Sequence, residues 1–301
     1  SQDNMDKDTT AAMNHSIRAA LSEDIGRGDI TANAIVSPDA TASAEIVCKE
    51  TGVIAGLTVA EAVFRTLDPG IDFRGMVPDG DTAEEGRVIA RISGKALPML
   101  SGERTALNYL QRLSGIATKT RCYVSSIAGT GARVFDTRKT CPGLRLLEKY
   151  AVRKGGGENH RNGLYDQVLI KENHLRSLEP AETRKPVTEA ISRVRRKYGR
   201  EIVVEVEVET LDELKTALAA GPDIVLLDNM RLSQMRRAVH LRNSTAPGVQ
   251  LEASGNVTLR RAPGIAETGV ERISVGELTH SVIGLDISML WKIEKGESKL
   301  Q

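Results

Sequence analysis

The feature of this chain that most restricts its fold is a regular alternation of strand-like and helix-like patterns that begins at Arg133. The runs that are typical of buried strands are 134–137, 167–170, 202–208, 223–227, 249–252 and 272–275. Amphipathic helical patterns separate them, and the later runs recur roughly every 20 to 25 residues, the period of a βα unit. The pattern predicts an α/β barrel or a doubly wound open sheet, and the lack of a GxGxxG turn after the first strand favours the barrel.

A second domain is expected before the barrel. Short β-like runs separated by Gly, Pro and Asp fill residues 42–97, and a long helical pattern covers residues 98–128. A helix is also expected from His15, whereas the polar residues 1–13 are expected to be disordered. A swinging-arm carrier module is a rival interpretation of the β-rich part, but no hairpin tip carries an obvious lysine.

The charge balance excludes several classes of partner. Lys and Arg number 41 against 40 Asp and Glu, and a net charge of +1 gives no general attraction to nucleic acid or to a membrane surface. No apolar run approaches the roughly 20 residues of a membrane-spanning helix. Three cysteines without metal-type spacing, and no signal-peptide pattern, favour a reduced cytoplasmic protein.

Positive charge is concentrated within residues 134–173. Cations follow the strand-like runs 134–137 and 167–170, and a further pair lies between these runs. The cations are Arg138, Lys139, His160, Arg161 and Lys171. Because ligands of parallel sheets bind at the carboxyl ends of the strands, this placement predicts a site for a polyanionic small molecule.

Acidic and glycine-containing segments follow the later strands. In EIVVEVEVET the acids Glu205, Glu207 and Glu209 alternate with valines and so share one face of a strand. If that face is buried, the cations above are their available partners; an edge strand with acids in water is the alternative. Asp228 ends the apolar run DIVLLD, where a buried carboxylate would need a cation or a hydroxyl partner. The turns in EASGN and SVGEL can hold a phosphate on backbone N–H groups, and their candidate residues are Ser254, Gly255, Asn256 and Gly276.

With these residues assembled, the chain resembles the quinolinate phosphoribosyltransferase family. The motifs that carry the resemblance span nearly the whole chain in family order: LSEDIGRGDIT at 21–31, ERTALNYLQRLSGIAT at 103–118, DTRKTCPGLR at 136–145, KGGGENHRNGL at 154–164, LIKENH at 169–174, VEVE at 204–207, LLDN at 226–229, EASGN at 252–256 and SVGELTHS at 274–281.

The resemblance implies an α/β fold with two domains. An N-terminal α/β sandwich over 14–128 is expected to be joined by the C-terminal segment 282–301, and an open α/β barrel of the type II phosphoribosyltransferase fold to occupy 129–281. The implied reaction transfers phosphoribose from phosphoribosyl pyrophosphate to quinolinate and releases pyrophosphate and carbon dioxide. The product is nicotinate mononucleotide for NAD synthesis. Magnesium is expected with the pyrophosphate, and a homodimer is expected, with assembly into hexamers left open.

The resemblance also implies residue roles. The residues expected to hold the two quinolinate carboxylates and neighbouring phosphates are Arg138, Lys139, His160, Arg161 and Lys171. Those expected near the ribose hydroxyls and magnesium are Glu207 and Asp228, and with Lys139 and Lys171 they form the expected catalytic set. Those expected to hold the 5′-phosphate are Ser254, Gly255, Asn256 and Gly276. Arg104 is expected to reach the site of the partner subunit.

Other functions remain open from the residues alone. A relative that acts on another heterocyclic acid would share the fold but should lack part of the two cationic pairs at 138–139 and 160–161. A barrel lyase or aldolase would use Lys171 as a Schiff base, and a third possibility is a non-catalytic barrel that only binds an anion. Cys141 as a nucleophile beside His160 lacks an evident third orienting group.

Overall fold

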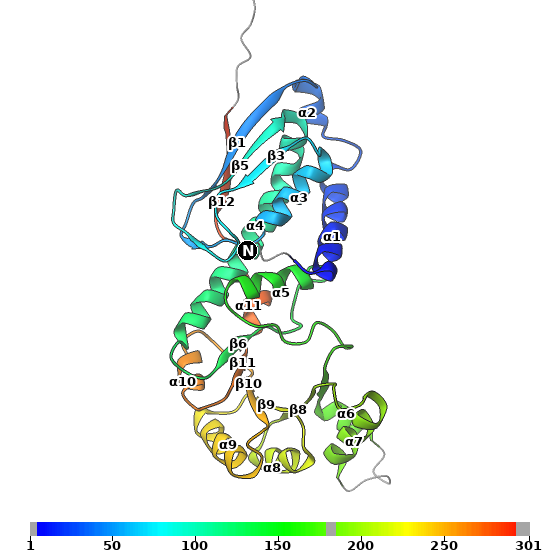
Figure 1. The fold of residues 1–301 in the computed structure, drawn as a ribbon, viewed down its shortest axis with the longest axis vertical. Helices are drawn as coiled ribbons and strands as arrows, with labels where there is room; N and C mark the ends of the chain where they lie inside the picture. The colour runs from blue at the N-terminus through cyan, green and yellow to red at the C-terminus, as the bar shows by residue number, and fades with distance from the viewer. Residues whose placement is uncertain (1–4, 179–184, 293–301) are drawn as a thin grey trace, which may run out of the picture. The chain divides into compact units, whose positions relative to one another are not determined.

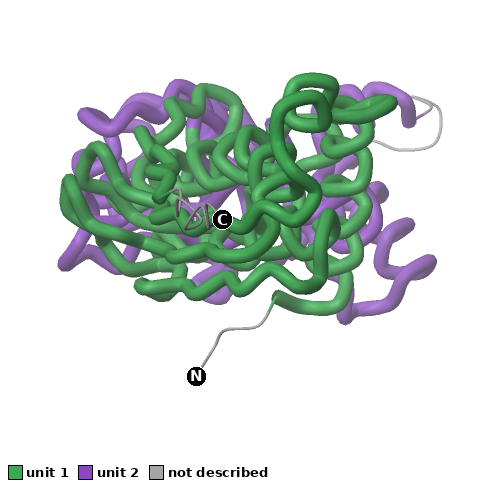
Figure 2. Tube along the Cα trace, turned by 90° about the horizontal axis from the view of Figure 1, so that it is seen from above, with its two compact units in different colours: residues 1–121, 140–156, 278–301 green, residues 122–139, 157–277 purple. Residues whose placement is uncertain are grey.

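The structure of the protein is a computed structural model that describes residues 5–178 and 185–292 of the 301-residue chain. The chain forms two compact units, which are coloured separately in Figure 2. The first comprises residues 1–121, 140–156 and 278–301, and the second comprises residues 122–139 and 157–277. Figure 1 labels the helices and strands along the chain.

The first unit is built on a four-stranded antiparallel sheet in the order β12-β1-β5-β3. Strand β1 (Thr41–Cys48) pairs on one side with β5 (Val88–Lys95) and on the other with β12 (Ile287–Lys292). The C-terminal segment therefore completes this sheet. The remaining strands are β3 (Asp72–Gly75) and the separate pair β2 (Gly52–Val53) and β4 (Thr82–Ala83).

Helices cover one face of this sheet, as Figure 1 shows for α3 and α4. The helices of the first unit are α1 (Lys7–Ile25), α2 (Ile30–Ile35), α3 (Leu57–Leu67), most of α4 (Ala96–Ser126) and α5 (Arg145–Lys154). The rings of Phe64 on α3 and Phe73 on β3 stack with centroids 6.2 Å apart, and both side chains are buried. This packing removes apolar surface from water and fixes α3 on the sheet.

Two expectations about the first unit were incomplete. Disorder up to residue 13 is wrong from Lys7 onward, because Asp6 caps α1 by accepting a hydrogen bond from the N–H of Thr9 at 2.7 Å, and Met13 is buried. Helix α3 was not predicted within the β-rich part. Its buried residues, among them Val59, Val63 and Phe64, recur at helical spacing, which was the available signal for a helix.

Helix α5 groups with the first unit, whereas the sequence boundaries placed residues 129–281 in the barrel. The α5 helix packs on α1. The hydroxyl of Tyr150 donates to Asp79 Oδ2 at 2.7 Å, and Arg112 pairs with the fully buried Glu148 at 2.6 Å. These contacts explain why residues 140–156 group with the first unit.

The second unit contains a six-stranded parallel sheet in the order β6-β11-β10-β9-β8-β7. Its strands are β6 (Arg133–Phe135), β7 (Val168–Ile170), β8 (Val204–Val208), β9 (Ile224–Asp228), β10 (Gln250–Ser254) and β11 (Arg272–Ser274). All six predicted strands are confirmed with small shifts at their ends. Within the described residues no ladder joins β6 to β7, which is the open side of a barrel sheet.

Helices connect these strands, as expected for βα units. They are α6 (Glu172–Arg176), α7 (Pro186–Tyr198), α8 (Leu211–Ala220), α9 (Leu232–Thr245) and α10 (Ala262–Ala266). The four-residue α11 (Glu277–His280) follows β11, and all but its first residue belongs to the first unit. The valines of β8 are buried, so the glutamates between them face the opposite side of the strand. None of the described helices is long and apolar enough to cross a membrane.

Candidate active site

Residues 158–161 form a strap beside the carboxyl end of β6. Main-chain hydrogen bonds pair the start of the strap with this strand. Asp136, which follows β6 and is fully buried, accepts hydrogen bonds from the main-chain N–H of His160 at 2.9 Å and from the amide of Asn159 at 2.6 Å. The strap is therefore fixed directly beside Arg138, the first of the predicted cations.

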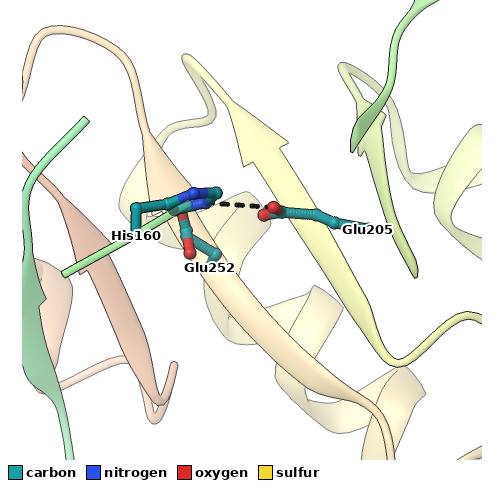
Figure 3. A group of neighbouring side chains, drawn as sticks. All are labelled: His160, Glu205 and Glu252. Atoms are coloured by element: carbon teal, nitrogen blue, oxygen red, sulfur yellow. Dashed lines mark ion pairs between the residues drawn. The ribbon is translucent and has the colours of Figure 1, made fainter. Parts of the chain in front are cut away.

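His160 lies between two fully buried glutamates that come from β8 and β10 (Figure 3). Its Nε2 atom is 3.0 Å from Oε2 of Glu205 and 3.3 Å from Oε1 of Glu252. Its Nδ1 atom accepts the main-chain N–H of Arg161 at 2.8 Å. Burial alone would lower the pKa of His160, but hydrogen bonds to Glu205 and Glu252 raise it to about 9. Arg272 donates to Glu252 Oε2 at 2.7 Å and supplies a permanent positive charge.

The guanidinium groups of Arg138 and Arg161 are near neighbours of like charge. Burial, and then repulsion from Arg138, lower the pKa of Arg161. The Nε atom of Arg138 is buried and has no hydrogen-bond partner, and neither group forms an ion pair with a carboxylate among the described residues. Glu205 and Asp166 attract Arg161 without forming an ion pair with it. Two adjacent cations without a directly paired carboxylate are costly unless an anion joins them. The pair therefore has the chemistry of a binding site for carboxylates or phosphates.

Lys171 and Glu207 meet at the carboxyl ends of β7 and β8. The Nζ of Lys171 is 2.5 Å from Oε2 of Glu207, and the lysine side chain is 46% exposed. This pair and that of His160 with Glu205 confirm that the cations are the partners of the acids on this face. Strand β8 lies between β7 and β9, so the interpretation of an acidic edge strand is wrong.

The turns after β9 and β10 interlock. Asn229 and Asn256 both have positive φ angles, 53° and 47°, and their side-chain amides are joined by a hydrogen bond of 2.9 Å. The N–H of Asn229 donates to the carbonyl of Ser254. At Gly255, where φ is +85°, a Cβ would lie 2.3 Å from Oδ1 of Asn229, so only glycine fits. Asp228, which accepts from Asn229 at 3.0 Å, is held at the edge of this double turn.

The remaining residues predicted for the site are Gly276, Lys139 and Arg104. Gly276 follows β11, and the next residue, Glu277, accepts a hydrogen bond from the hydroxyl of Tyr123. Lys139 is exposed, and its main-chain N–H donates to the hydroxyl of Thr137 at 3.0 Å. Arg104 belongs to the first unit, where it lies exposed on α4, and its side chain makes no hydrogen bond or ion pair with the described residues.

Two groups of carboxylates could hold a metal ion. His160, Glu205 and Glu252 each offer a ligand atom within 4.8 Å of the others, but the cation Arg272 already pairs with Glu252. Glu207 and Asp228 are only partly buried and sit at the carboxyl ends of adjacent strands. Magnesium is usually held by one or two carboxylates together with substrate phosphates. Glu207 and Asp228 fit this pattern of ligands.

Family models match nearly all of the described chain. The model for the quinolinate phosphoribosyl transferase N-terminal domain matches residues 29–114, and that for the C-terminal domain matches residues 116–290. The chain belongs to the quinolinate phosphoribosyl transferase family. The two models of this family meet inside α4, whereas the compact units divide after residue 121.

Individual quinolinate phosphoribosyl transferase relatives are similar over most of their length. A protein of Bacillus subtilis (strain 168) named as a probable nicotinate-nucleotide pyrophosphorylase (carboxylating) is 45% identical over 267 residues, which are 89% of each chain. The enzyme of that name from Mycobacterium leprae is 43% identical over 92% of this chain and 96% of its own. The solved structure of the nicotinate-nucleotide pyrophosphorylase of Francisella tularensis has a TM-score of 0.86 at 37% identity, covering 97% of this chain and 99% of its own.

The fold brings together several residues that the sequence analysis did not assign to the site. They are Asp136, Gln167, Glu252 and Arg272. Glu252 is the last residue of the predicted strand run 249–252 and opens a motif that was singled out for its glycine, whereas Asp136 opens the motif of the first cations. For Glu252 and Arg272 the available signal was a charged residue inside an otherwise buried strand, because such residues are rarely buried without partners.

Proposed function

We propose that this chain carries out the reaction for which its relatives are named. It transfers the phosphoribosyl group of phosphoribosyl pyrophosphate to quinolinate and forms nicotinate mononucleotide, pyrophosphate and carbon dioxide in NAD synthesis. The observation that carries this assignment is the pair Arg138 and Arg161, two neighbouring guanidinium groups without a carboxylate partner among the described residues. Quinolinate has two adjacent carboxylates, and planar guanidinium groups bind such anions in a bidentate manner.

The acids and the double turn suit the phosphoribosyl donor. Ser254, Gly255 and Asn256 offer a hydroxyl and a backbone that approaches without a Cβ, and with Gly276 they would hold the 5′-phosphate. Glu207 and Asp228 would lie near the ribose hydroxyls and support the cation-like sugar centre that develops as pyrophosphate leaves.

The bond changes require few dedicated groups. The ring nitrogen of quinolinate forms a bond to the sugar carbon as the bond from that carbon to pyrophosphate breaks, and Lys139 and Lys171 would balance the leaving charge. The ring nitrogen is then positively charged. That charge stabilises the electron pair left on the ring when the adjacent carboxylate departs as carbon dioxide, and a proton from water completes the product.

Magnesium is part of the proposal. When bound, it would neutralise pyrophosphate charge, and Glu207 and Asp228 would contact it largely through the substrate. Chelation is expected to abolish turnover and to leave quinolinate binding, measured by calorimetry without the second substrate, unchanged. Turnover that persists in excess chelator would contradict the role of the metal.

The homodimer and the cytoplasmic location also belong to the proposal. In the homodimer, with assembly into hexamers open, the exposed Arg104 of one subunit would contact quinolinate in the site of the partner subunit. Sedimentation measurements would test the assembly, and cell fractionation would test the location.

A Schiff-base lyase is a weaker alternative, because the ammonium of Lys171 is paired with Glu207 and an ion-paired ammonium is not a nucleophile. Failure to trap Lys171 with borohydride in the presence of carbonyl compounds is the expected result.

The direct test of the carboxylate site is equilibrium binding of quinolinate compared with nicotinate. Nicotinate lacks one carboxylate, and loss of a charge-assisted hydrogen-bonded pair is expected to weaken binding by about 10- to 100-fold. Equal affinities for the two acids would contradict the assignment of Arg138 and Arg161 to a pair of carboxylates.

A further inference from the structure

The two turns proposed to hold the 5′-phosphate follow neighbouring strands of the parallel sheet. Strands β10 and β11 pair directly, with Ala253 opposite Ile273. The first turn is residues 254–256 at the end of β10, and the second contains Gly276, shortly after β11. A phosphate that contacts both turns requires a fixed spacing between them, because hydrogen bonds weaken steeply outside a narrow range of distances and angles.

A buried tyrosine joins the segments that follow these two turns. Tyr123 belongs to α4, and its side chain is only 1% exposed. Its hydroxyl donates a hydrogen bond to Oε1 of Glu277, the residue directly after Gly276. The same hydroxyl is 3.5 Å from the carbonyl oxygen of Val257, the residue directly after the first turn. All of these residues belong to the second unit.

The hydroxyl of Tyr123 is a neutral donor in this position. Burial, the hydrogen bond to Glu277 and the charge of Glu277 raise the pKa of Tyr123, whereas a hydrogen bond from the main chain of Leu259 lowers it. The hydroxyl therefore keeps its proton at neutral pH. It donates that proton to the carboxylate, and its oxygen accepts from the loop after β10.

We propose that Tyr123 is a positioning residue for the phosphate of the sugar donor, because its hydroxyl ties the loop after β10 to the residue after Gly276. The carboxylate of Glu277 would repel a phosphate, so its contribution is to anchor the second turn on Tyr123. The inference rests on the proposed function only for the identity of the donor, phosphoribosyl pyrophosphate. Anion binding by the turns can be tested without any reaction.

The first test is a titration with inorganic phosphate that follows the amide signal of Gly276 by NMR. The chain contains a single Val-Gly sequence, at 275–276, so carbonyl-labelled valine combined with nitrogen-labelled glycine selects this one signal. Phosphate is expected to shift the signal saturably in the wild type, and the dissociation constant is expected to rise about tenfold in Tyr123→Phe. No shift in the wild type, or equal affinity in the two proteins, overturns the proposal.

Tyr109→Phe is the matched control on the same helix. The hydroxyl of Tyr109 is 2.5 Å from that of Ser16, the tyrosine is buried, and both residues belong to the first unit. Each Tyr→Phe variant removes one hydrogen-bonded hydroxyl from α4, so a loss of thermal stability is expected in both. Only Tyr123→Phe should weaken phosphate binding. An equal effect of Tyr109→Phe on phosphate binding overturns the proposal.

The second test separates the two substrates kinetically. In Tyr123→Phe the KM for phosphoribosyl pyrophosphate is expected to rise about tenfold, with the KM for quinolinate nearly constant. A parallel rise of both KM values overturns the positioning role. Absence of turnover in the wild type would contradict the proposed function alone, and the phosphate titration would still decide the role of Tyr123.

The third test compares two substitutions of Glu277. Gln and Ala both remove the negative charge, but only Gln keeps an acceptor for the hydroxyl of Tyr123. Phosphate is therefore expected to bind more weakly to Glu277→Ala than to Glu277→Gln. Adding Tyr123→Phe should weaken binding more in the Gln background than in the Ala background. Equal effects in the two backgrounds overturn the proposal; if Tyr123→Phe fails to fold, equal affinities of the two single variants of Glu277 do so.

Discussion

Replacing Arg161 with alanine is expected to lower kcat/KM for quinolinate by about 100- to 1,000-fold, which corresponds to about 3–4 kcal/mol for a lost bidentate pair. The fold should survive, because the side chain of Arg161 is only partly buried and its hydrogen bond to the carbonyl of Gln167 is long, at 3.4 Å. Steady-state kinetics with both substrates, together with thermal unfolding, measures the effect.

Two control variants separate charge from geometry. Arg161→Lys keeps the charge but loses the planar fork, and an intermediate loss is expected. Arg193→Ala removes one positive charge from a surface pair with Glu189 and should change turnover little. Near-normal turnover of Arg161→Ala would remove Arg161 from the quinolinate site.

The second large effect is expected from mixing two inactive variants. Arg104→Ala and Lys139→Ala subunits should each have little activity alone. If Arg104 completes the site of the partner, each mixed dimer has one intact site, so random exchange should restore about a quarter of wild-type activity. Activity is measured after subunit exchange has been verified with differently tagged chains.

Recovery in this experiment depends on a shared site. Mixing Arg104→Ala with wild-type chains gives the matched reference for exchange. No recovery after verified exchange would place Arg104 and Lys139 either in one subunit's site or outside the site altogether.

The barrel could be predicted from the sequence because its signals are local. Apolar runs of strand length alternate with amphipathic helices, and each predicted run forms a strand of the sheet. The alternation of Glu205 and Glu207 with valines also predicted a shared face with the cations as partners, and His160 and Lys171 are those partners. Period-two patterning determines such a face without tertiary information.

The remaining features depend on contacts between distant residues. Helix α5 groups with the first unit through the ion pair between its own Glu148 and Arg112 of α4, two residues that lie far apart in sequence. One partner of the buried His160 is Glu252, which lies almost a hundred residues later in the chain. From the sequence, His160 could therefore be placed only in a group of cations. Oppositely charged residues on different strands of a parallel sheet follow no periodic pattern in the sequence.

The most direct test of the proposed reaction is turnover of phosphoribosyl pyrophosphate with quinolinate and with nicotinate in parallel, with magnesium present. Nicotinate mononucleotide, pyrophosphate and carbon dioxide are measured together. All three are expected in equal amounts from quinolinate, and no product is expected from nicotinate. Nicotinate mononucleotide formed from nicotinate, or no product from quinolinate, would contradict it.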